Sequence, residues 1–167
     1  AVSKTFSISK ILPLINYGQK DFGENKVQEA IEKWTDIKKD FTDINLHMIG
    51  KLQTNKVKYV VPLFDYIHSL DSLKLAEIIA EQQIKFKKKL SIFIQINIGN
   101  EEQKNGIEIE NLDSFYLKCT TQFDLKIIGL MCLPPANNSA IYFSKIRDLN
   151  NNLKLKELSM GMSNDYL

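Results

Sequence analysis

The hydrophobic and polar positions along this chain form two alternating patterns. One is a short, continuous apolar run rich in β-branched or aromatic residues, which is typical of a strand buried on both faces. Such runs lie at 46–50, 66–70, 90–98 and 125–133. The other pattern repeats apolar residues every three or four positions and predicts amphipathic helices. It covers 25–39, 71–87, 110–121 and 139–153.

Three shorter segments complete the predicted strands: a stub at 1–3, a DFG strand at 21–23 and KELS at 156–159. This gives about seven β units, each but the last followed by a helix, and such alternation predicts a parallel sheet with covered faces. Seven repeats favour an α/β fold of the (β/α)8 TIM-barrel type over a doubly wound sheet. An open sheet with a nucleotide site is the alternative, but neither GxGxxG nor GxxxxGK[ST] occurs. The length of 167 residues predicts one domain over 1–167.

The composition narrows the range of partners. A net charge of +2 with Arg147 as the single arginine predicts neither a nucleic-acid nor a membrane partner. Cys119 and Cys132 have no CxxC spacing and no histidine nearby, so we expect reduced thiols and no metal site. No apolar run is long enough to span a membrane, and no signal-peptide pattern precedes Ala1. We therefore expect a cytoplasmic protein, in which KFKKK at 85–89 is a solvated helix end.

Lys4 directly follows the stub at 1–3, in the position where barrel proteins place functional groups after a strand. A lysine there can act as a point charge on a phosphate, or as a nucleophile that forms a Schiff base with an aldehyde. The second use requires a neutral amine, which desolvation beside an apolar strand favours. Because the chain contains many lysines, the position of Lys4 alone also fits an ordinary exposed side chain.

The segment SMGMS at 159–163 is a candidate anion site. Gly161 permits a positive φ, and successive backbone N–H groups in such a turn form a nest for an anion. Ser163 can add its hydroxyl to this nest or cap a following helix, and the sequence leaves both open. His47 and His68 lie inside predicted strands and are interpreted as satisfied core histidines. No Ser/His/Asp order or paired-carboxylate spacing predicts catalytic residues.

Seven motifs occur in a characteristic order along the whole chain. They are AVSK, FGENKVQEA (22–30), LHMIGKLQTNK (46–56), IHSLD (67–71), IQINIGNEEQKNGI (94–107), GLMCLPP (129–135) and LSMGMSNDY (158–166). Through these motifs together the chain resembles the pyridoxal-phosphate homeostasis protein family, also known as the proline synthase co-transcribed protein family. Each motif alone would be a weak signal, whereas their order and coverage make the resemblance specific.

The resemblance implies a single-domain (β/α)8 barrel similar to the N-terminal domain of alanine racemase. It implies pyridoxal 5′-phosphate held as a Schiff base on Lys4, with a phosphate site at Ser163 and the backbone of Gly161 and Met162. The resemblance also implies that Asn25 lies at the same end of the barrel and takes part in cofactor binding. The implied role is non-catalytic and intracellular, namely binding of the cofactor in vitamin B6 homeostasis. We also expect a monomer, with pyridoxal-phosphate-dependent apo-enzymes as partners.

The chain departs from the family pattern at both ends. Family members have an N-terminal helix and most of a strand ahead of AVSK. After SMGMSNDY they continue with a helix and a last strand containing Gly-Ser-Thr and Arg-Ile-Gly, which supplies further phosphate contacts. We therefore expect a barrel truncated at both ends, with about seven βα units. Two alternative functions stay open: an amino-acid racemase-like enzyme that uses the same cofactor, and a truncated remnant with impaired cofactor binding.

Overall fold

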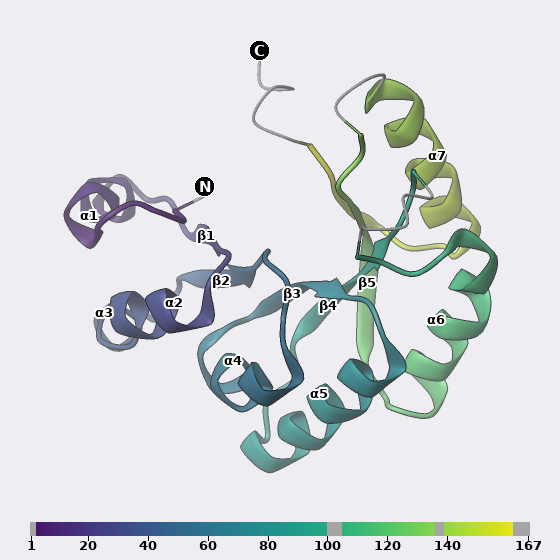
Figure 1. Ribbon diagram of the computed structural model, residues 1–167. Helices are drawn as coiled ribbons and strands as arrows, with labels where there is room; N and C mark the ends of the chain where they lie inside the picture. Colours follow the sequence, from purple (N-terminus) through teal and green to yellow (C-terminus); the bar gives the residue numbers. More distant parts are fainter. Residues whose placement is uncertain (1–2, 100–104, 136–138, 162–167) are drawn as a thin grey trace.

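The computed structural model describes residues 3–99, 105–135 and 139–161, whose arrangement is shown in Figure 1. Parallel strands form one curled sheet, and helices lie along its convex side. The order along the sheet is β1-β2-β3-β4-β5-β6, so each strand lies beside the strand that precedes it in the chain. This is the order of a β/α barrel, whereas a doubly wound sheet reverses its strand order at a switch point. The predicted α/β class is confirmed.

The six strands are short and mostly buried. They are β1 Asp21–Glu24, β2 Asn45–Met48, β3 Tyr66–Leu70, β4 Ser91–Ile96, β5 Lys126–Cys132 and β6 Glu157–Ser159. In β4 every residue after the first is buried, as its continuous apolar run predicted. A central parallel strand is covered on both faces, so its sequence shows no alternation between apolar and polar residues.

The described residues also contain seven α-helices and two short 3-10 turns. They are α1 Ile8–Asn16, α2 Val27–Trp34, α3 Ile37–Asp40, η1 Thr54–Lys56, α4 Val57–Leu63, α5 Leu73–Phe86, η2 Ile109–Asn111, α6 Leu112–Thr121 and α7 Ser139–Asn152. The single helix predicted at 25–39 is divided into α2 and α3. The β/α alternation implied helices after 1–3 and after 46–50, but no helical period was located there. The structure has α1 and α4 in these intervals, and each contains a proline, a residue that normally interrupts a helix. None of the described helices has both the length and the apolar character needed to cross a membrane.

The strand count and the closure of the barrel differ from the sequence prediction. The sheet has six strands within the described residues, not about seven β units. Of the predicted stub, residues 1–2 lie outside the described residues and Ser3 belongs to no strand. The Ser3 amide nevertheless donates to the carbonyl oxygen of Gly23, 3.0 Å away, so Ser3 lies beside β1. No ladder between described residues joins β1 to β6, and the observed architecture is a curled half-barrel.

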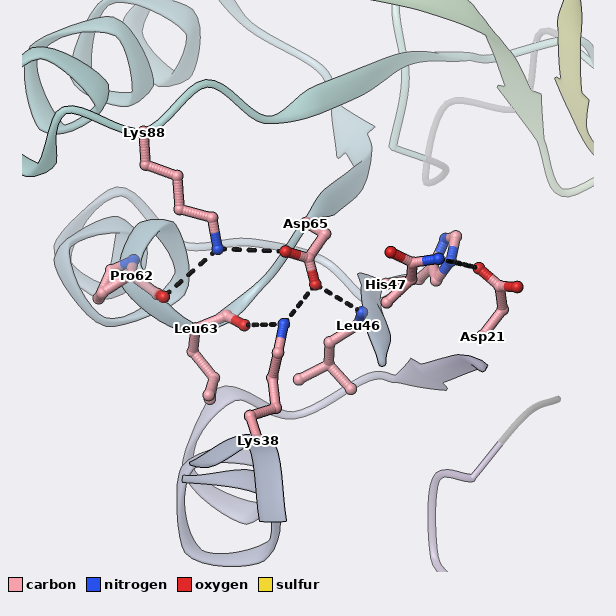
Figure 2. Close-up of polar contacts among 9 residues, drawn as sticks. Asp21, Lys38, Leu46, His47, Pro62, Leu63, Asp65 and Lys88 are labelled. Carbon is pink, nitrogen blue, oxygen red and sulfur yellow. Dashed lines mark hydrogen bonds and ion pairs between the residues drawn. The ribbon is translucent and has the colours of Figure 1, made fainter. Parts of the chain in front are cut away.

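Asp65 directly precedes β3 and connects three segments at the end of the sheet where the strands begin (Figure 2). Its carboxylate accepts hydrogen bonds from Lys38 of α3 and from the backbone amide of Leu46, and it pairs with Lys88 at 3.2 Å. Burial acts to raise the pKa of Asp65, but the hydrogen bonds and the two lysine charges outweigh it and hold the pKa below its usual range. Asp65 is therefore ionised at neutral pH and fixes α3 and the segment before β4 against the sheet.

Replacing Asp65 with alanine should lower the free energy of unfolding by about 2–3 kcal/mol, because two partly buried lysines lose their shared carboxylate. Urea unfolding followed by circular dichroism measures this change. Asp43→Ala is the matched control, since Asp43 pairs with Lys20 on the surface and both side chains are more than half exposed. A loss of at most about 0.5 kcal/mol is expected there. Equal losses in the two variants would contradict the role given to Asp65.

Candidate functional site

The candidate site is the carboxyl edge of the sheet, the end at which all six strands finish. Parallel pairing brings every strand terminus to this edge, where barrel proteins bind their ligands. Lys4 lies beside the end of β1, because its backbone amide donates to the carbonyl oxygen of Gly23 at 3.2 Å. The side chain of Lys4 is exposed. The fold thus places a lysine with an accessible amine at the edge where a ligand is expected.

Asn25 directly follows β1 at the same edge. Gly50, which follows β2, packs so closely that a Cβ there would lie 2.2 Å from the Asn25 carbonyl oxygen, so a side chain at position 50 would clash. The side-chain oxygens of Asn25 and of Ser69 in β3 are buried and have no hydrogen-bond partner among the described residues. Buried polar atoms are nearly always paired. The edge therefore has unused hydrogen-bonding capacity that a polar ligand can take up.

Gly161 follows β6, two residues beyond its last residue, Ser159. Its φ of +116° lies in the region that side chains rarely adopt, which explains why glycine occupies this position. Met162 and Ser163, the other two residues predicted for the anion site, lie outside the described residues. Lys4 and Asn25 are at the β1 end of the strand order and Gly161 is at the β6 end.

Two titratable groups at the carboxyl edge have perturbed pKa values. Burial raises the pKa of the Asp71 carboxyl, directly after β3, although the charge of Lys51 acts in the opposite direction. Burial also raises the pKa of the Cys132 thiol at the end of β5 to about 11, so this thiol stays protonated and unreactive at neutral pH. Asp71 and Ser69 were not among the predicted site residues. The signal that could have selected them is their position at the end of a predicted strand.

A chain of hydrogen-bonded side chains links four strands of the half-barrel. Asp21 Oδ1 lies 3.1 Å from His47 Nε2, His47 Nδ1 lies 3.0 Å from His68 Nε2, and His68 Nδ1 lies 2.7 Å from Ser159 Oγ. Figure 2 shows the contact at the Asp21 end of this chain. One set of protons satisfies all three contacts: Ser159 donates to His68, His68 to His47, and His47 to Asp21. Both rings are neutral in this arrangement. The interpretation as a satisfied core histidine is confirmed for His68, which is buried, whereas His47 is hydrogen-bonded but only partly buried.

The histidine chain borders a cavity of ≈ 700 Å³ that opens at the amino ends of the strands. Its lining includes the first residue of five strands, namely Asp21, Tyr66, Ser91, Lys126 and Glu157. This opening is therefore at the other end of the strands from the carboxyl edge. Because barrel proteins place their chemistry at the carboxyl ends of the strands, we do not assign the cavity to the candidate site.

Comparison with known proteins decides the family. A family model described as the alanine racemase N-terminal domain matches residues 1–167. The pyridoxal phosphate homeostasis protein of Aquifex aeolicus is 38% identical over 98% of this chain and 75% of its own length. The chain belongs to the pyridoxal phosphate homeostasis protein family. The resemblance drawn from the seven motifs is thereby confirmed.

Solved structures agree with this family membership. The protein PipY of Synechococcus elongatus, solved without pyridoxal phosphate, is 32% identical and superposes with a TM-score of 0.85 over 99% of this chain and 82% of its own. PipY has also been solved with pyridoxal phosphate bound, with a TM-score of 0.82. An alanine racemase of Clostridium difficile superposes with a TM-score of 0.72 at 11% identity over 95% of this chain and 46% of its own. At that identity the likeness extends to the fold alone.

Proposed function

We propose that this chain binds pyridoxal 5′-phosphate at the carboxyl edge and acts in intracellular homeostasis of that cofactor. The observation on which this rests is the position of Lys4, with an exposed side chain and its backbone bonded to the end of β1, in a chain of the homeostasis family. Bound pyridoxal phosphate supplies an aldehyde, which condenses with a neutral lysine amine with loss of water. Lys4 is the proposed point of attachment.

The residues at the carboxyl edge fit a cofactor of this kind. Asn25 offers a buried side-chain oxygen that lacks a partner among the described residues, and a polar ligand can satisfy it. Gly161 has the positive φ that a nest of backbone N–H groups requires, and such a nest binds a phosphate. We propose the backbone of Met162 and the hydroxyl of Ser163 as further phosphate ligands, as the SMGMS motif indicates. Lys4 and Asn25 would then orient the aldehyde end while the segment at 161–163 holds the anion.

The wider role proposed for the chain follows its family. We propose a single cofactor-binding domain over 1–167 that forms the major part of an eight-stranded β/α barrel, supported by the parallel strands in sequential order. We propose that it is non-catalytic, monomeric and cytoplasmic, and that it exchanges cofactor with apo-enzymes that depend on pyridoxal phosphate. Buried cysteines with raised pKa values, about 12 for Cys119 and about 11 for Cys132, offer no thiolate nucleophile.

Lys4→Ala should abolish covalent attachment of pyridoxal phosphate. The protein is mixed with the cofactor, reduced with borohydride and analysed by mass spectrometry of its peptides, so that the modified lysine is identified directly. The matched control is Lys10→Ala, because Lys10 is exposed in the same N-terminal segment and should leave the yield unchanged. An adduct that forms equally well in Lys4→Ala would refute the assignment.

Sustained exchange of deuterium into the α-carbon of an amino acid would instead favour the racemase-like alternative.

A further inference from the structure

Lys4 occupies a tight turn whose backbone is strained. The amide of Phe6 donates to the carbonyl oxygen of Ser3 at 3.2 Å, which closes a four-residue turn with Lys4 and Thr5 at its centre. Thr5 has a φ of +71°, a conformation usual for glycine or asparagine at the third position of a turn and unfavourable for a β-branched residue. Strained residues persist only where surrounding contacts determine the backbone, and they are concentrated at functional sites.

Those surrounding contacts converge on Ser3, which is 3% exposed. Its amide is bonded to the Gly23 carbonyl oxygen, and its hydroxyl donates to Glu24 Oε1 at 2.6 Å. Its carbonyl oxygen accepts a second hydrogen bond, from Lys33 Nζ at 3.2 Å. Every polar group of Ser3 is therefore fixed, and the residue that follows it, Lys4, starts from a defined position.

Glu24 is the hydrogen-bond acceptor that Ser3 shares with two residues of α2. Its side chain is fully buried, and Oε1 accepts hydrogen bonds from Ser3, from Lys33 Nζ at 2.8 Å and from Trp34 Nε1 at 2.9 Å. Lys33 is itself only 11% exposed, so the two opposite charges form a buried pair that is costly to break. The pair connects β1 and α2 to the segment that precedes Lys4. We call Ser3, Glu24, Lys33 and Trp34 the Glu24 cluster.

We propose that the Glu24 cluster is a positioning device for Lys4, which holds the turn at 3–6 so that the lysine amine meets an incoming aldehyde at the carboxyl edge. This proposal rests on the proposed function. A lysine side chain loses considerable conformational freedom when it is held for reaction, and fixing its backbone in advance removes part of that cost. None of the four residues needs to touch the cofactor, since they act through the geometry of the Lys4 backbone.

The test is the rate at which Lys4 forms its adduct, followed by stopped-flow absorbance at limiting aldehyde. Ser3→Ala removes the hydroxyl that joins the turn to Glu24 and leaves the bonds of Glu24 to Lys33 and Trp34 in place. We expect the second-order rate constant to fall about 10-fold or more. The fall should be equal with pyridoxal and with pyridoxal phosphate, because the cluster acts on the amine and not on the phosphate. Ser3→Thr keeps the hydroxyl and should restore most of the rate.

Ser7→Ala is the matched control, since Ser7 is an exposed serine of the same segment whose hydroxyl is hydrogen-bonded to Ser9 and not to Glu24. Its rate should equal that of the wild type, and circular dichroism confirms that each variant is folded. A Ser3→Ala rate within twofold of the wild type, or a Ser3→Thr rate as low as that of Ser3→Ala, would overturn the positioning role while leaving the proposed function intact. A wild type that forms no adduct at Lys4 would overturn both proposals.

Discussion

Replacing Trp34 with alanine is expected to lower the free energy of unfolding by about 3–5 kcal/mol, the cost of truncating a large buried aromatic side chain. Trp34 has no exposed surface, and its ring lies 5.0 Å from that of Phe22 between centroids. The truncation leaves a cavity between α2 and β1 and also removes the indole N–H that donates to Glu24. The surrounding backbone can fill such a cavity only in part, so most of the loss should remain.

Urea unfolding followed by far-UV circular dichroism measures this loss without relying on tryptophan fluorescence, which the variant no longer has. Tyr17→Ala is the control for removing an aromatic ring, since Tyr17 is 92% exposed and should change the stability by at most about 0.5 kcal/mol. Trp34→Phe separates packing from hydrogen bonding, because it keeps a ring but not the N–H group. A loss below about 1 kcal/mol in Trp34→Ala would show that α2 is not anchored through this residue.

The second large effect is a loss of stability in mild acid that originates at His68. Burial, with a smaller contribution from the neighbouring His47, lowers the pKa of His68 to about 3 in the folded protein. In the unfolded chain it returns to about 6.5. Below that value the unfolded state binds a proton that the folded state does not, so stability falls as the pH drops from about 6.5 toward 3. The expected contribution is up to about 4 kcal/mol at the acid end of this window.

The measurement is the free energy of urea unfolding at a series of pH values from 7 to 4. His68→Gln removes the titrating group, so its stability should depend less steeply on pH than that of the wild type over this range. Several carboxylates with lowered pKa values, including Asp65, also lose stabilising interactions in acid, but they do so equally in both proteins. His47→Gln, in the neighbouring histidine, is measured over the same pH range as a second variant. If the wild type and His68→Gln had the same pH dependence, the buried neutral state of His68 would be wrong.

The sequence predicted much of the fold because parallel strands and their covering helices leave distinct periods. The strands β2 to β5 and the helices α5 to α7 were found from these periods alone, with bounds that differ from the structure by a few residues. The helices α1 and α4 were implied by the alternation but not located. Pro13 and Pro62 lie within them, and the sequence does not show that neighbouring contacts tolerate a proline there. The stub before Lys4 was assigned to a strand, but its one described residue, Ser3, belongs to no strand and is held beside β1 by hydrogen bonds from its amide and its hydroxyl.

The candidate site, like the fold, was predicted from the sequence only in part. By itself the sequence determined the sequential β/α order, the family, and a glycine placed after a strand end. It predicted Lys4 after a strand, whereas Lys4 lies beside the end of β1. Only the tertiary structure decided that Ser3 is fixed by Glu24 and that His68 is joined to Ser159, partners separated by 21 and 91 positions in the chain. The physical reason is that periodicity reports which face of an element is buried, whereas such contacts depend on the register and curl of strands distant in sequence. The environment of Lys4 is therefore a property of the folded sheet and not of the motif that contains it.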